Sequence, residues 1–124
     1  MEQWIIPCNI KYYDVEGAFE KLKCLDWKQS NKSIHVGDEV YIYIGKPVQA
    51  IKYRCKVNKV NIDGIEIDDS EFVRDGEPYE TYRNHMEIEL VEKYDGFRYS
   101  LEVLRKRGLK GNIQGPRRAN GLFD

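Results

Sequence analysis

Three stretches of this chain alternate two kinds of residue with a period of two, and this alternation limits the fold more than any other feature. Aliphatic residues alternate with tyrosines over 40–44, apolar residues alternate with polar and basic ones over 51–57, and apolar residues alternate with glutamates over 86–90. A period of two places successive side chains on opposite faces of a β-strand. We therefore expect a sheet whose strands present at least one face to a core.

Other stretches predict further elements around these strands. The apolar run 4–8 is typical of a short buried strand, in which Pro7 marks an edge or a bulge. Asp14 can cap a helix that carries an apolar stripe at helical spacing, and Ser100 can cap a second short helix that ends at Gly108. The members of the first stripe are Val15, Ala18, Phe19, Leu22 and Leu25. The stretch 26–33 is too polar to be buried, except for Trp27.

The connections favour an antiparallel arrangement. A change of phase near Asn58 and Lys59 predicts a bulge, Asp63-Gly64 predicts a hairpin turn, and the acidic stretch 68–82 predicts a surface loop. We expect a single α+β domain over 1–124, with a small mixed, mainly antiparallel β-barrel flanked by short helices. The residues expected to point into it are Ile42, Ile44, Tyr53, Cys55, Met86 and Ile88, with Phe19 and Leu22 closing one end.

Length and composition agree with this expectation. A chain of 124 residues is about one domain, and 41% hydrophobic residues are enough for a core that needs no disulfide or metal to stabilise it. No apolar run reaches the length of a membrane span, and the first residues do not have the pattern of a signal peptide. The three cysteines show no Cys-x-x-Cys spacing. We expect a cytoplasmic protein without a membrane partner.

The net charge of −1 conceals three unequal blocks. Residues 1–62 carry ten Lys/Arg against seven Asp/Glu, residues 63–95 carry three against twelve, and residues 96–124 carry seven against two. Glycines between 108 and 115 allow close approach to an anion, and arginine forks suit phosphate. Solvated surfaces would look similar. The residues expected to bind phosphates are Lys110, Gln114, Arg117 and Arg118.

Aromatic residues beside polar ones indicate a base-binding pocket. Ring faces can stack on a nucleobase while amides and hydroxyls read its edge. The aromatic residues expected in the pocket are Tyr12, Tyr13, Trp27 and Tyr43, with Trp27 and either Tyr12 or Tyr13 stacking on the base. The expected edge contacts are Asn9, Gln29 and Ser30. Core capping by the same aromatic rings is the alternative.

Signals of catalysis are weak. His35 and His85 have no partner at metal-ligand spacing, and the acidic residues of 63–71 match no calcium-loop pattern. We expect no enzyme activity, no metal and no cofactor. A small metal-dependent nuclease that uses His85 or the acidic loop is the alternative of a different class.

Five motifs in the same order resemble the EVE domains of the PUA-like superfamily, in particular the prokaryotic branch found alone or ahead of HNH-type nuclease modules. They are the stretches 4–9, 11–14, 26–30, 36–43 and 111–118, which read WIIPCN, KYYD, DWKQS, VGDEVYIY and GNIQGPRR. The resemblance implies a small β-barrel that recognises modified bases in DNA, such as methylated or hydroxymethylated cytosine, often in restriction with a nuclease partner. PUA-like folds also serve RNA, so an RNA-binding module is the second interpretation.

Overall fold

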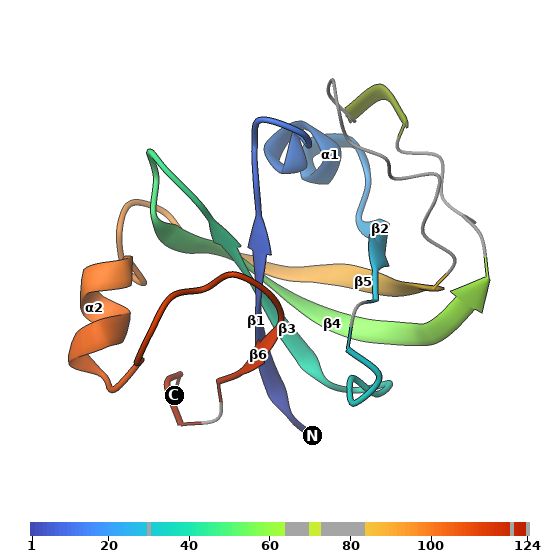
Figure 1. The fold of residues 1–124 in the computed structure, drawn as a ribbon. Coiled ribbons are helices and arrows are strands. Elements are labelled where there is room, and N and C mark those ends of the chain that lie inside the picture. The colour runs from blue at the N-terminus through green and yellow to red at the C-terminus, as the bar shows by residue number, and fades with distance from the viewer. Residues whose placement is uncertain (30, 64–69, 73–83, 120, 124) are drawn as a thin grey trace.

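The computed structural model describes residues 1–29, 31–63, 70–72, 84–119 and 121–123, which form one six-stranded sheet with two short α-helices (Figure 1). In chain order the elements are β1 (Gln3–Cys8), α1 (Val15–Lys21), β2 (Cys24–Lys28), β3 (Glu39–Ile44), β4 (Ala50–Asp63), the 3-10 turn η1 (Ser70–Phe72), β5 (Asn84–Lys93), α2 (Leu101–Lys106) and β6 (Arg117–Arg118).

The sheet is open and mostly antiparallel. Its strand order is β2-β5-β4-β3-β1-β6, so β2 and β6 are the two edges. Every neighbouring pair is antiparallel except β1 and β3, which run parallel. The expected α+β class and mainly antiparallel sheet are confirmed, whereas the expected closed part of the barrel is wrong because β2 and β6 do not pair.

The two faces of β3 bury two separate sets of side chains. Val40 and Ile42 belong to a first cluster that includes the buried residues of α1, while Tyr41 and Tyr43 belong to a second cluster that includes Leu104 of α2. The predicted division between aliphatic and tyrosine faces is therefore confirmed. The first cluster also holds every residue that was predicted to point inward, namely Ile42, Ile44, Tyr53, Cys55, Met86, Ile88 and Phe19, with Leu22 packed against it.

The first helix is shorter than its apolar stripe predicted. The carboxylate of Asp14 caps α1 by accepting from the Gly17 amide at 3.1 Å, as expected. Leu22, however, adopts an extended conformation and ends the helix, and Leu25 lies in β2 opposite Ile88. The expectation of a helical Leu25 is wrong, because this residue belongs to an edge strand. The expectation that the polar stretch stays unburied apart from Trp27 is also wrong, since Asp26 and Gln29 are buried.

The second helix follows its sequence signals. The Ser100 hydroxyl accepts from the Val103 amide at 3.2 Å, and Gly108 has a positive φ of 116° just beyond the helix. The amide of the buried Leu109 then donates to the Leu104 carbonyl at 3.0 Å. A glycine in this conformation releases the chain from the helix at little steric cost.

The long strand β4 carries the predicted irregularity. Its register on β5 shifts between Val57 and Lys59, which confirms the bulge, and again before Ile62. Asn61 has a φ of 56°, a conformation for which asparagine is better suited than most residues. The turn predicted at Asp63-Gly64 and its return strand with Ile65 and Ile67 lie outside the described residues. So does most of the predicted acidic loop, except for η1, whose Phe72 carbonyl accepts from the Asp14 amide at 2.7 Å.

A single buried carboxylate joins β1 to the start of β3. Asp38 accepts from the Glu2 amide at 3.0 Å, the Trp4 indole at 3.0 Å and the His35 amide at 2.9 Å. Burial alone would raise the pKa of Asp38, but these hydrogen bonds outweigh it and hold the pKa below its ordinary value. The ionised form is therefore the one that the fold stabilises.

Replacing Asp38 with Asn should destabilise the protein by about 2–3 kcal/mol at neutral pH, because hydrogen bonds to a buried charge are among the stronger ones. A carboxyl whose pKa is lowered on folding stabilises the fold above its unfolded pKa, and this contribution is lost as the pH falls through the lower folded value. Urea unfolding at pH 7 and pH 3 should therefore show a smaller difference between the two proteins at pH 3. The exposed Asp95→Asn is the control, and an equal difference at both pH values would contradict the prediction.

Candidate nucleic-acid interface

The two predicted groups of binding residues lie at opposite edges of the sheet. Trp27 is on the edge strand β2, whereas Arg117 and Arg118 form the edge strand β6. Tyr43 belongs to neither edge, since it lies on β3 in the second cluster. The structure thus separates the predicted stacking residues from the predicted phosphate-binding residues.

Trp27 and Tyr13 come together beside α1. Their ring centroids are 5.5 Å apart and the rings are nearly perpendicular, at 79°. Both are half-buried and pack against the first cluster, where Trp27 lies opposite Met86 of β5. An edge-to-face pair of this kind holds each ring in a defined orientation. Trp27 therefore has a structural role in the core and still keeps part of its surface accessible.

Asn9 shapes the turn that presents the two tyrosines. Its carbonyl accepts from the amides of Tyr12 and Tyr13 at 3.0 and 3.2 Å, and its side-chain oxygen accepts from the Lys11 amide at 2.9 Å. The Lys11 ammonium lies 5.4 Å from the centre of the Tyr12 ring. Asn9 uses its side-chain oxygen for the local turn, and asparagine is favoured at such positions for this reason.

Gln29 is buried and engaged with the backbone. Its side-chain oxygen accepts from the backbone amide of Asn61 at 2.8 Å, and its backbone amide donates to the Asn84 carbonyl at 3.0 Å. These two hydrogen bonds connect Gln29, which directly follows β2 and lies two residues beyond Trp27, to both β4 and β5. Ser30, the third predicted edge contact, lies outside the described residues.

A basic surface surrounds α2 on the other side of the molecule. The stretch 97–118 contains seven Lys/Arg and one acidic residue, Glu102. Tyr99 lies beneath two of its guanidinium groups, those of Arg98 and Arg107, at 5.2 and 5.5 Å from the ring centre. We define the basic surface as Arg98, Arg105, Lys106, Arg107, Lys110 and Arg117.

Asn112 links α2 to β6 within the basic surface. Arg117 donates to the carbonyls of Lys110 at 2.7 Å and Asn112 at 3.5 Å, and Arg105 donates to the side-chain oxygen of Asn112 at 3.4 Å. Two positive side chains are thereby held around one exposed segment, in which Gln114 is also exposed. The sequence gives no separate signal for Asn112 beyond its place among glycines.

Arg118 does not join the basic surface. Arg117 pairs with Ile5 of the second cluster and Arg118 with Trp4 of the first, so the two neighbours point to opposite faces. The Arg118 guanidinium lies 5.1 Å from the Trp4 ring, and its Nε is 3.5 Å from a Glu2 carboxylate oxygen. The two arginines that were predicted to bind phosphates together therefore lie on opposite faces of the sheet.

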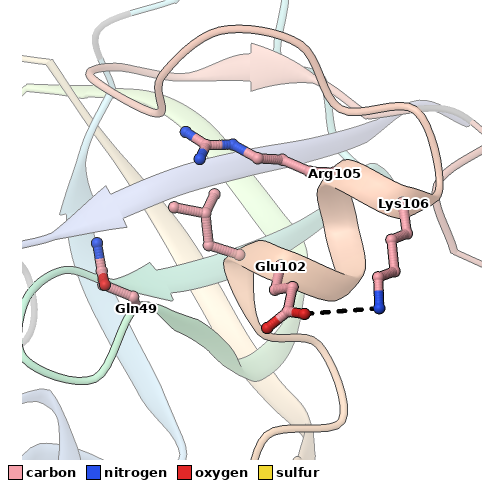
Figure 2. A pocket seen from close by; sticks show the side chains of 5 residues that line it. Gln49, Glu102, Arg105 and Lys106 are labelled. Carbon is pink, nitrogen blue, oxygen red and sulfur yellow. Dashed lines mark ion pairs between the residues drawn. The ribbon is translucent and has the colours of Figure 1, made fainter.

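A groove of about 510 Å³ lies between α2 and the β3–β4 connection, where Arg105 and Lys106 of the basic surface line it. Its lining comes from Gln49 of the β3–β4 connection and from Leu101, Glu102, Arg105 and Lys106 of the helix (Figure 2). Lys106 is 3.5 Å from Glu102, while Arg105 extends along the helix toward the 109–116 segment. Burial raises the pKa of Tyr43, and the positive charge of Arg105 opposes this rise.

The described part of the chain has neither a metal cluster nor a membrane-spanning helix. No group of three or more His, Cys, Asp or Glu side chains in it could hold a metal ion. None of its helices combines the length and the apolar character needed to cross a membrane. His35 is exposed, whereas His85 is buried in β5.

Comparisons with known proteins support the fold alone. No protein-family model matches the chain, and no curated protein matches it either. Three solved structures share the fold. A Pseudomonas putida protein is 14% identical with a TM-score of 0.66, over 97% of this chain and 93% of that one. The S128A mutant of an ASCH protein from Zymomonas mobilis is 10% identical with a TM-score of 0.63, over 98% and 90%.

The third is a hypothetical protein from Leishmania major, which is 12% identical with a TM-score of 0.63, over 98% of this chain and 88% of that one. The chain thus shares the fold of these three proteins, one of which is an ASCH protein. The EVE branch expected from the sequence motifs is not distinguished by these likenesses.

Removing the buried Gln29 side chain should lower stability, because its part-buried hydrogen bond from the Asn61 amide would be lost. We expect Gln29→Ala to cost about 1–3 kcal/mol in the free energy of unfolding. Gln114→Ala, which truncates an exposed glutamine, should change it by less than about 0.5 kcal/mol. Thermal and urea unfolding of both variants provides the measurement, and equal stabilities would contradict this role of Gln29.

Proposed function

We propose that this chain binds nucleic acid without catalysing a reaction, with phosphates on the basic surface and a nucleobase against Trp27. The observation that carries the proposal is the concentration of positive charge around α2. Six cations from α2, its flanking segments and β6 form this surface, and Glu102 is the one acidic residue within 97–118. Such a local basic face binds a phosphate backbone even when the total charge of the protein is close to zero.

The arrangement of the guanidinium groups supports phosphate contacts. Arg98 and Arg107 lie over Tyr99 and Arg105 is bonded to Asn112, so these side chains are partly ordered before a ligand arrives. Ordering a long side chain on binding costs about 0.5–1.5 kcal/mol, and preorganisation lowers this cost. Arginine also matches phosphate through paired donors.

The position of Trp27 supports contact with a base. It is half-buried on an edge strand, and Tyr13 fixes the orientation of its ring. A fixed ring at an edge can stack on an unpaired or extruded base, which contributes about 1–3 kcal/mol. The proposed base is a modified cytosine in DNA, as the EVE resemblance implies, and a separate nuclease in the same cell would then supply cleavage in restriction.

The basic surface can be tested through the salt dependence of binding. Lys106→Gln with Lys110→Gln should reduce the slope of log Kobs against log salt by up to about 2, because each lost phosphate contact removes about 0.9 from the slope. The loss should be equal for modified and unmodified oligonucleotides, since phosphates carry no sequence information. The matched control is Lys32→Gln with Lys56→Gln, which removes the same charge from exposed sites elsewhere. A control that flattens the slope equally would refute the basic surface as the binding face.

The Trp27 site can be tested through base preference. Trp27→Ala should weaken binding to a modified-cytosine oligonucleotide about ten- to hundredfold while the salt slope stays unchanged. Because Trp27 also packs in the core, Trp27→Phe is needed as a ring-preserving variant, and it should keep most of the affinity. Fluorescence anisotropy with cytosine, 5-methylcytosine and 5-hydroxymethylcytosine oligonucleotides, in DNA and matched RNA, measures both. Tighter binding to RNA would favour the RNA-binding interpretation, and normal binding by a folded Trp27→Ala protein would reject this site.

A further inference from the structure

A second pocket lies between α1 and the β3–β4 connection, away from the basic surface around α2. Its volume is about 400 Å³, which is within the usual range for small-molecule sites. One wall comes from α1, and the other comes from the ends of β3 and β5 and the start of β4. Val15, Ile44 and Val48 give this pocket, which we call the α1 pocket, an apolar part.

Tyr53 brings an unpaired hydroxyl to the α1 pocket. The residue is 7% exposed and lines the pocket, and its ring packs on Phe19 at 5.1 Å. Among the described residues no group donates to or accepts from its hydroxyl. The hydroxyl is not one of the fully buried polar atoms that lack a partner, so it is open to the α1 pocket. A ligand in the α1 pocket could therefore form a hydrogen bond with it.

The charges around this hydroxyl are mainly negative. Glu16 and Glu20 lie one turn apart on α1 and both line the α1 pocket. Neither carboxylate forms an ion pair within the described part of the chain. Burial raises the pKa of Tyr53 to about 12, and the carboxylate of Glu16 acts in the same direction. The hydroxyl therefore stays protonated at neutral pH and lies within electrostatic reach of α1.

The positive charges of the α1 pocket do not cancel the carboxylates. Its lining contains Glu16, Glu20 and Asp95 against Lys52 and Lys93. The Lys52 ammonium donates to the Gly96 carbonyl and lies 5.0 Å from the Phe97 ring, so it is directed toward that loop. The lining has a net charge of −1 from these five residues, which favours a cation.

We propose that the α1 pocket binds a small aliphatic amine. An ammonium group has three donors and no acceptor, and Glu16, Glu20 and the Tyr53 hydroxyl supply three acceptors. The methylene chain of the ligand then packs on Val15, Ile44 and Val48, as apolar stems do in mixed sites. This site is independent of the proposed nucleic-acid interface and survives if that function fails.

The test is titration of the nucleic-acid-free protein with n-butylammonium chloride and 1,4-diaminobutane, followed by amide chemical shifts in ¹H–¹⁵N NMR spectra. Saturable shifts confined to 10–20, 44–53 and 93–96 are expected below about 20 mM, since so small a ligand has at best a millimolar Kd. Sodium butyrate and n-butanol, which lack the positive charge, should produce no saturable shifts. Equal effects of butanol, scattered unsaturated shifts, or no shifts at all would each overturn the proposal.

Three variants separate the parts of the α1 pocket. Tyr53→Phe should weaken amine binding about tenfold or more, as expected for a hydrogen bond to a charged group. It should leave the melting temperature nearly unchanged, because the hydroxyl has no internal partner. Glu16→Gln with Glu20→Gln should abolish binding, and Glu102→Gln on α2 should leave it intact. A Tyr53→Phe protein that is clearly less stable, or that binds the amine as before, would contradict the assignment.

Discussion

The carboxylate of Asp38 determines how β1 lies on β3, and the rest of the architecture depends on this contact. It binds the backbone of Glu2 and the indole of Trp4, immediately beside the first pair of the parallel ladder, Gln3 and Glu39. A shift by one residue would move every side chain of β1 to the opposite face. Trp4 would leave the first cluster and Ile5 the second, so a single buried charge specifies both cores.

The register of β1 also decides which arginines can act together. Because β6 pairs with β1 at Trp4 and Ile5, Arg118 lies on the same face of the sheet as Trp4, and Arg117 lies on the same face as Ile5. Arg117 consequently reaches the carbonyl of Lys110, whereas Arg118 covers Trp4. Pro7 is compatible with this pairing, because β6 pairs with β1 only at Trp4 and Ile5. The edge of β1 that faces β6 is therefore unpaired at Pro7, the residue that lacks an N–H.

The sequence predicted the parts of the fold that depend on local chemistry. The two-residue period of β3 and the caps at Asp14 and Ser100 are confirmed, since each depends on neighbouring residues. The edge strand β2 was not predicted, because Leu25 also fits the helical stripe and only pairing with β5 distinguishes the two. The separation of Tyr43 from Trp27, and the use of the Gln29 oxygen by Asn61, result from contacts distant in sequence that no local pattern contains.

The order of the strands bears on how one ligand could use both proposed nucleic-acid contacts. Five steps separate β2 from β6 in the strand order. Groups that are well separated and share no partner contribute nearly additively to free energies. The basic surface would then supply affinity that is independent of the identity of the base, and Trp27 would supply the preference for one base over another. Proteins that share this fold at 10–14% identity can therefore keep the sheet while the residues at its edges differ.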